Sequence, residues 1–249
     1  MKKLTITTPY HVAPNETTPN HQVKSEVIFN WLQDSMLDYS DHLGIGYNVC
    51  KERDLTYILR GYDIQINELP RFLDSTFLQT KLSHITQTSF FFEQTLYDKS
   101  LKKQLLTSSS QAVLVDAIKG RPVKIKDNLS TENLPEPINA SSLEPIQPIE
   151  RVDSKIIQEI PFDYIDFNQH VNNSKYITLA ERGLSPELLK KMRLKRIAVA
   201  YKSAAKLGDQ LEIQTQISPT SSQHQIVQKE NPKKICAQVR FDWMKSNSR

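Results

Sequence analysis

The chain has 249 residues, enough for one large domain or two domains of roughly 100–150 residues each. Hydrophobic residues make up 38% and charged residues 24%, a globular composition that excludes disorder throughout the chain. The net charge of +4 is far below the loading that nucleic-acid binding usually needs, so we expect no nucleic-acid partner.

No stretch approaches the roughly 18 uninterrupted apolar residues of a membrane span, so we expect no membrane insertion. Lys2 and Lys3 are not followed by the apolar run of a signal peptide. Cys50 and Cys236 lie far apart, without Cys or His at ligand spacing, which argues against a disulfide and a metal site. These features predict a cytoplasmic protein.

The first predicted element is a helix that begins at Ser25, as its N-cap, and ends near the glycines at 44 and 46. A run of strand-like segments follows, at residues 55–59, 63–66, 76–80, 88–92 and 112–115. Hairpin turns are predicted at 97–100 and 119–120.

The composition of the sequence changes between residues 127 and 153, where four prolines alternate with Asn, Ser and Glu. This segment is too long for an ordinary loop and reads as a linker. It divides the chain into a predicted first domain at 1–126 and a second at 154–249. In the second, residues 156–160 read as a strand, and Asn172 or Asn173 is expected to cap a helix.

The two halves of the chain resemble each other. The segment from Ile66 to Asp74 and the segment from Tyr201 to Asp209 have the same length, and each is followed by period-2 alternation. A threonine lies six residues after each Asp. Because each half also places a helix upstream and strands in a run, we expect two tandem α+β units with antiparallel sheets.

Asp166, Asn168 and His170 are the candidate chemical groups. In an extended segment, positions i, i+2 and i+4 share one face, which would gather a carboxylate, an amide and an imidazole. Asn172 and Asn173 would add the N–H groups of a helix start, suited to an oxyanion. The alternative is a polar turn that caps a helix, since these residue types are common in turns.

Residues 163–176, with Asp-x-Asn-x-His-Val-Asn-Asn at 166–173, resemble the second-domain signature of acyl-acyl-carrier-protein thioesterases. The resemblance covers nearly the whole chain and includes Gln33, residues 43–46, Pro70 before Asp74, residues 121–125, and Gly208-Asp209. It implies an α+β tandem double hotdog fold, each half an antiparallel sheet wrapped around a long α-helix.

The resemblance further implies hydrolysis of the thioester between a fatty acyl chain and acyl carrier protein, during fatty acid biosynthesis and without a cofactor. His170 would help to activate water, Asp166 would set its orientation and charge, and Asn168 would position the thioester or the water. The rival interpretations are an acyl-CoA thioesterase and a catalytically weak acyl-binding or regulatory protein. A tandem hotdog is compatible with a monomer or a homodimer.

One position departs from the family pattern. The family usually carries a glutamate three residues after the tyrosine that Tyr201 resembles, and this chain has Ala204 there. Either the remaining three groups suffice, or Glu181 acts as an auxiliary acid or base, or catalysis is weak. The plain alternative for Glu181 is a solvated helix face.

A cluster of five cations follows the helical segment 186–189. Acyl carrier proteins are acidic, so the cluster is a candidate docking surface whose attraction salt would weaken. The alternative is an exposed helix end whose cations stabilise the helix C-terminus. The five residues are Lys190, Lys191, Arg193, Lys195 and Arg196.

Overall fold

A single antiparallel sheet of ten strands runs through the computed structural model, which describes residues 4–139 and 143–245. The strand order is β1-β3-β4-β5-β2-β7-β10-β9-β8-β6. The strands are β1 (Ile6–His11), β2 (Leu55–Ile66), β3 (Ser75–Ile85), β4 (Ser89–Asp98), β5 (Gln104–Asp116), β6 (Ser154–Glu159), β7 (Met192–Tyr201), β8 (Gln210–Ser218), β9 (Ser221–Gln228) and β10 (Asn231–Lys245). The helices are α1 (Ser25–His42), α2 (Tyr47–Lys51), α3 (Ile125–Asn128), α4 (Lys175–Arg182) and α5 (Pro186–Lys191), with 3₁₀ turns at Pro14–Glu16 and Phe162–Tyr164.

The strand order confirms the predicted repeat. The first half has the order β1-β3-β4-β5-β2, and the second half has the equivalent order β6-β8-β9-β10-β7. Equivalent strands therefore follow one another in the same order from either edge of the sheet. The repeated Asp has the same contact in both halves: Asp74 Oδ2 accepts from Arg71 N at 2.8 Å, and Asp209 Oδ2 accepts from Lys206 N at 2.9 Å. The similarity between the segments therefore reflects one folding unit used twice.

β2 and β7 join the two halves at the centre of the sheet, in a register that pairs Gly61 with Ala200 and Gln65 with Arg196. A Cβ on Gly61 would lie 2.1 Å from the carbonyl oxygen of Val199, so only glycine fits there. The Arg196 guanidinium donates to both carboxylate oxygens of Asp63, at 2.8 and 2.7 Å. Arg196, one of the five clustered cations, is thus held in an ion pair where the two halves of the sheet meet.

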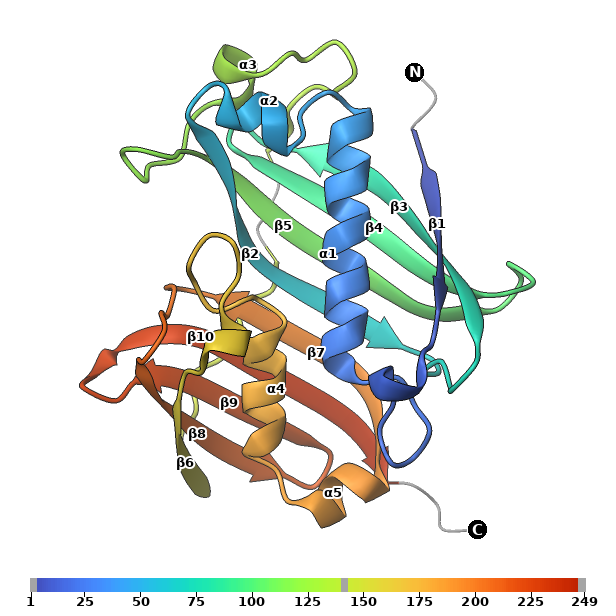
Figure 1. Cartoon of the computed structure of the whole chain (residues 1–249), viewed down its shortest axis with the longest axis vertical. Helices are drawn as coiled ribbons and strands as arrows, with labels where there is room; N and C mark the ends of the chain where they lie inside the picture. The colour runs from blue at the N-terminus through green and yellow to red at the C-terminus, as the bar shows by residue number, and fades with distance from the viewer. Residues whose placement is uncertain (1–3, 140–142, 246–249) are drawn as a thin grey trace.

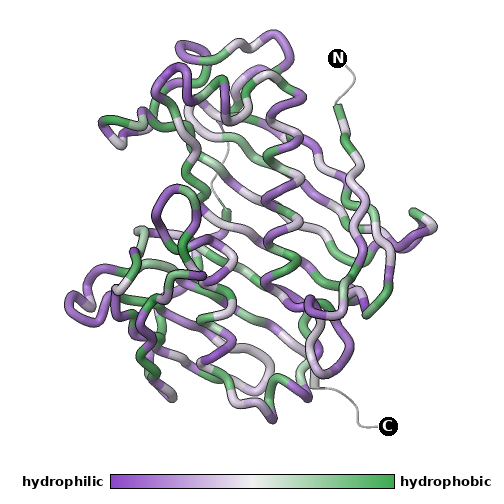
Figure 2. The backbone as a smooth tube through the Cα atoms, in the orientation of Figure 1, coloured by the Kyte–Doolittle hydropathy of each residue, from purple (hydrophilic) through white to green (hydrophobic). Residues whose placement is uncertain are grey.

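Each half places a helix on its strands (Figure 1). α1 contacts β1 and β3, α4 contacts β8, β9 and β10, and the two helices touch each other. α1 has 18 residues and α4 has 8, so the expectation of a long helix holds for the first half only. Apolar and polar residues are interleaved along the strands (Figure 2), as expected when one face of a sheet is buried.

Two local predictions need correction. Residues 55–59 and 63–66 form one strand, β2, with an irregularity between Leu59 and Gly61. Lys24, and not Ser25, is the N-cap of α1, because the Ser25 hydroxyl bonds to α4 instead. The end of α1 is as predicted, with Gly44 at a φ of +73°.

The proline-rich segment carries no helix or strand at residues 129–139 and 143–153; residues 140–142 lie outside the described residues. It is nevertheless attached to the sheet, since Ile138 N donates to Ile85 O at 2.9 Å. None of the helices in the described part of the chain is long and apolar enough to cross a bilayer.

Candidate active site

Asp166, Asn168 and His170 lie in a tight loop closed by an antiparallel bridge between Ile165 and Val171. Asp166 Oδ1 accepts from the backbone N–H groups of Asn168 (2.9 Å) and His170 (3.4 Å). Gln169 is left-handed, with a φ of +60°. The expectation of an extended segment is therefore wrong, because the Asp166 carboxylate organises a turn within five residues.

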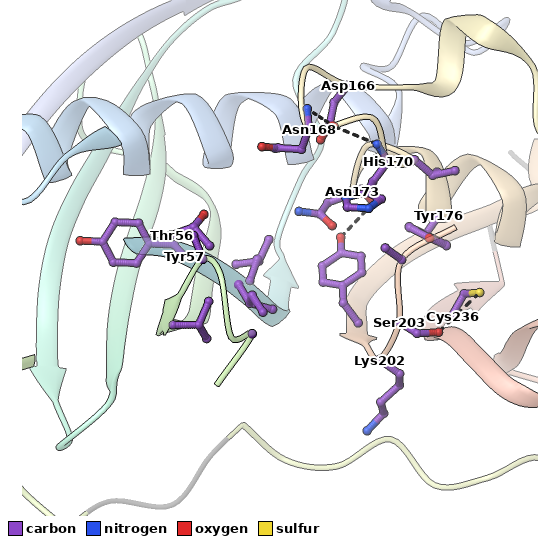
Figure 3. Close-up of a pocket in the computed structure, with 18 of the residues that line it drawn as sticks. Thr56, Tyr57, Asp166, Asn168, His170, Asn173, Tyr176, Lys202, Ser203 and Cys236 are labelled. Carbon is purple, nitrogen blue, oxygen red and sulfur yellow. Dashed lines mark hydrogen bonds between the residues drawn. The ribbon is translucent and has the colours of Figure 1, made fainter. Parts of the chain in front are cut away.

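The turn still brings the three side chains to one place. Asp166, Asn168 and His170 all line a cavity of about 470 Å³, and Figure 3 shows them on one side of it. Asp166 and His170 are half-buried, and Asn168 is exposed. The predicted gathering of carboxylate, amide and imidazole is thus present, although a turn and not a strand produces it.

The helix after the loop begins later than expected, with Ser174 as the N-cap and Lys175 as the first helical residue of α4. Asn172 Oδ1 accepts from the N–H of Ser174 at 2.9 Å and from its hydroxyl at 3.0 Å. Asn172 therefore stabilises the approach to the helix without capping it. Asn173 lines the cavity, and its carbonyl oxygen accepts from the Tyr201 hydroxyl at 3.0 Å.

Two buried tyrosines support the wall of the cavity. The Tyr176 hydroxyl accepts from Ala205 N at 3.2 Å, and Val171 N donates to Ala205 O at 2.9 Å, so the site loop is attached to the segment after β7. The rings of Tyr176 and Tyr201 lie 5.9 Å apart, edge to face. Burial raises the pKa of Tyr201 well above its ordinary value, so its hydroxyl stays a neutral donor.

Ala204 lines the same cavity as Asp166, Asn168 and His170, and it is exposed. A carboxylate at this position would enter the space that those three side chains face. The departure from the family pattern therefore lies within the site.

Ser203 and Cys236 are the hydroxyl and thiol candidates for a protein nucleophile in the cavity wall. The Ser203 hydroxyl donates to Ile235 O at 2.7 Å. Cys236 is buried, and this burial raises the pKa of its thiol, which disfavours the nucleophilic thiolate. Neither group is activated by a hydrogen-bonded base in the described residues, which favours water as the nucleophile.

The first half supplies the opposite wall, which sequence reasoning missed. Residues 56–59 of β2 and residues 115–117 and Gly120 at the end of β5 line the cavity across from the site loop (Figure 3). Their sequence carries no catalytic signature. Only the pairing of β2 with β7 brings them near the loop, so the motif could not have revealed them.

Glu181 lies elsewhere, at the contact between the two helices. Its Oε1 accepts from the Ser25 hydroxyl at 2.6 Å, and it lines a second cavity of about 220 Å³ that contains none of the three site residues. The pKa of Glu181 is raised to about 7: burial is the main cause, the Ser25 hydrogen bond opposes it, and the nearby Glu26 carboxylate adds to the rise. The structure thus separates Glu181 from the loop.

The five clustered cations divide between α5 and β7. Lys190 and Lys191 end α5, and Arg193, which is exposed, belongs to β7 together with the half-buried Lys195 and Arg196. Arg193 and Lys202 are nine residues apart along an extended strand, which is about 30 Å. The cluster therefore lies at the opposite end of β7 from the cavity.

No group of three or more His, Cys, Asp or Glu side chains is placed to hold a metal ion in residues 4–139 and 143–245.

Two family profiles match the chain. The acyl-ACP thioesterase N-terminal domain matches residues 3–132, and the C-terminal domain of the same family matches residues 149–245.

Curated relatives include the acyl-acyl-carrier-protein hydrolase FATB2 of Cuphea viscosissima, 22% identical over 209 residues, and a palmitoyl-acyl carrier protein thioesterase of Cuphea hookeriana, 23% identical. Each alignment covers 78% of this chain and 51% or 50% of the relative. The chain spans about half the length of the curated relatives that it matches.

Solved structures share the fold over nearly the whole chain. An oleoyl thioesterase structure from Lactobacillus plantarum superposes with a TM-score of 0.89 at 19% identity, covering 99% of this chain and 97% of the other. The 12:0-ACP thioesterase of Umbellularia californica superposes with a TM-score of 0.85 at 14% identity, covering 99% of both chains. The ten-stranded architecture is the double hotdog of these proteins.

Proposed function

Because the chain belongs to the acyl-ACP thioesterase family, we propose that it hydrolyses the thioester of a fatty acyl chain carried on acyl carrier protein. The observation that carries the proposal is the convergence of Asp166, Asn168 and His170 on one cavity between the two halves. We retain 127–153 as the proposed linker between an acyl-binding first domain and a catalytic second domain.

Water is the proposed nucleophile. His170 removes a proton from the water as it adds to the thioester carbonyl, and the carbon–sulfur bond then breaks. The sulfur leaves as a thiol after it takes up that proton, and the acyl chain leaves as a carboxylic acid. General-base assistance of this kind contributes about a hundredfold to ten-thousandfold in rate.

Asp166 and Asn168 have separate proposed roles. Asp166 Oδ1 fixes the turn by bonding to the N–H groups of Asn168 and His170, so it sets the direction in which the imidazole points. Asn168 is exposed to the cavity, where its amide can hold the thioester oxygen or the water. α4 begins directly after Asn173, with Ser174 as its N-cap, and adds a positive dipole end close to the cavity wall.

Release of thiol is the direct test of the activity. We expect the wild type to release thiol from acyl carrier protein thioesters faster than from the matching acyl-CoA, and Asp166→Ala to lose most of this release. A faster reaction with acyl-CoA would favour the second enzyme interpretation. Release that is the same in both proteins would contradict the assignment of the loop.

Ala204 favours one other candidate function, a weakly catalytic acyl-binding protein. This candidate predicts acyl-ligand binding without thiol release. Ala204→Glu, assayed beside the wild type, would then restore release by returning the carboxylate that the family usually has. Release by the wild type at a rate that Ala204→Glu does not increase would exclude this candidate.

We propose that the exposed cations Lys190, Lys191 and Arg193 steer the acidic carrier protein, since steering acts over distance and does not require contact with the cavity. The double charge reversal Lys191→Glu with Arg193→Glu should lower kcat/KM for the carrier-linked substrate by about tenfold at low salt. The loss should shrink at high salt, because ions screen exposed charges.

Acyl-CoA is the control substrate in this test, and Lys206→Glu, in an exposed position near the cavity, is the comparison variant. Equal losses with both substrates would argue against steering by the cluster. A large effect of Lys206→Glu alone would place the carrier at the cavity mouth.

A further inference from the structure

Four buried polar atoms lie together beneath α1 without a hydrogen-bond partner in the described residues. They are the Tyr62 hydroxyl, Gln94 Oε1, Ser108 Oγ and Ser110 Oγ, and their residues are at most 3% exposed. Gln94 pairs with Ser108 across β4 and β5, and Ser110 pairs with Tyr62 across β5 and β2. We call these four residues the polar block.

The second half provides an internal comparison for Gln94. His224 of β9 occupies the equivalent place, because it faces the repeated threonine, Thr215, in the same register. Both of its ring nitrogens have partners: Thr215 Oγ1 at 3.0 Å and Ser222 Oγ at 2.7 Å. The second half therefore satisfies its buried polar side chain internally, and the first half does not.

The serines of the polar block are also specific to the first half. In the corresponding register, β10 carries Val239 and Phe241 where β5 carries Ser108 and Ser110. Both are fully buried. The same strand position thus accepts apolar side chains, so the fold does not require hydroxyl groups there. A buried hydroxyl without a hydrogen-bond partner costs free energy, so buried hydroxyl groups are normally bonded to another polar group.

Three residues of the polar block lie on strands that also form the first-half wall of the proposed catalytic cavity. Tyr62 pairs with Val199 across β2 and β7, two residues before Tyr201, which lines that cavity. Leu59 and Val115 line the cavity from β2 and β5, the strands that carry Tyr62 and the two serines. An acyl chain that passed from this cavity into the apolar interior of the first half would run along the strands that carry these three residues.

The orientation of Gln94 indicates what kind of group fits. Its Nε2 donates to Leu32 O of α1 at 2.8 Å and to Thr80 Oγ1 at 3.2 Å, which leaves Oε1 as a bare acceptor. The serine and tyrosine hydroxyls can donate or accept. A hydroxyl on the acyl chain could donate to Gln94 and accept from a neighbour, whereas a ketone could only accept.

We infer that the polar block recognises a hydroxyl group on the acyl chain, so that the preferred substrate is a hydroxyacyl thioester and not a plain saturated one. This inference rests on the proposed function for its substrate, but ligand binding can be measured without catalysis. It also predicts that methylene groups alone leave the four polar atoms unsatisfied.

Thiol release should be compared among plain, oxo and hydroxyacyl carrier thioesters of equal length, with the hydroxyl moved along the chain. We expect one hydroxyl position to raise kcat/KM about two- to tenfold over the plain chain, the range for one or two net hydrogen bonds, and the ketone to gain less. No gain at any position, or efficient release of short plain chains alone, would overturn the inference.

The double variant Ser108→Ala with Ser110→Ala should remove the preference for hydroxyl without loss of stability, because the two hydroxyls have no partner to lose. The matched control is Ser109→Ala, on the same strand but exposed. Thermal shifts with free hydroxy fatty acid and plain fatty acid test binding apart from hydrolysis. Equal shifts would contradict the inference, whereas unequal shifts without thiol release would contradict only the proposed function.

Discussion

His170→Ala is expected to lower kcat for thiol release by about a hundredfold to ten-thousandfold, the contribution of a positioned general base. KM should change less, because the imidazole assists the chemical step more than it binds the acyl chain. The side chain of His170 makes no hydrogen bond to another described residue, so the variant should keep its melting temperature. Steady-state kinetics on carrier-linked substrate, with thermal denaturation beside it, gives both measurements.

Gln169→Asn is the matched control for this variant. Gln169 shares the loop and has a left-handed backbone, which asparagine tolerates. The control should retain nearly full turnover. If His170→Ala also retained it, His170 would not be the base, and the chemistry of the loop would need a different assignment.

Glu181→Gln is expected to raise the free energy of unfolding at pH 8 by up to about 3 kcal/mol and to change it little at pH 4, below both pKa values. The pKa of Glu181 is about 7 in the folded protein, against about 4.3 in an unfolded chain. Between these values the folded state holds a proton that the unfolded state releases, so stability falls as the pH rises. Glutamine removes this dependence and can still accept from Ser25.

The surrounding charges support the sign of this effect. Burial acts to raise the pKa of Glu26, but hydrogen bonds from Lys175 and Thr178 outweigh it and lower that pKa, so Glu26 stays charged beside Glu181. Urea denaturation at several pH values measures the effect, with Glu187→Gln on α5 as an exposed control. Parallel pH profiles for the wild type and Glu181→Gln would contradict the prediction.

The helix contact also changes the interpretation of Glu181. The sequence alone left two interpretations of Glu181 open: an auxiliary acid or base, or a residue on a solvated helix face. In the structure it is hydrogen-bonded to Ser25, 156 residues away, at the junction of the two halves. Its burial follows from the meeting of α1 and α4, which no local pattern encodes.

The sequence by itself determined the features that depend on contacts between near neighbours. The end of α1 at a left-handed glycine and the Asp turns at 74 and 209 all form within a few residues, so residue type and spacing suffice to specify them. The candidate groups Asp166, Asn168 and His170 were identified in the same way. Their extended geometry was predicted wrongly, because the bond from Asp166 to its own loop outweighs the alternation of the sequence.

Only the tertiary structure decided which distant segments face one another. The pairing of β2 with β7 joins residues more than 130 positions apart, and it supplies the first-half wall of the cavity and the ion pair between Asp63 and Arg196. The polar block likewise exists only once three strands and α1 are in register. These contacts depend on strand order and helix packing, because the energy of a long-range contact is realised only after the chain has closed around it.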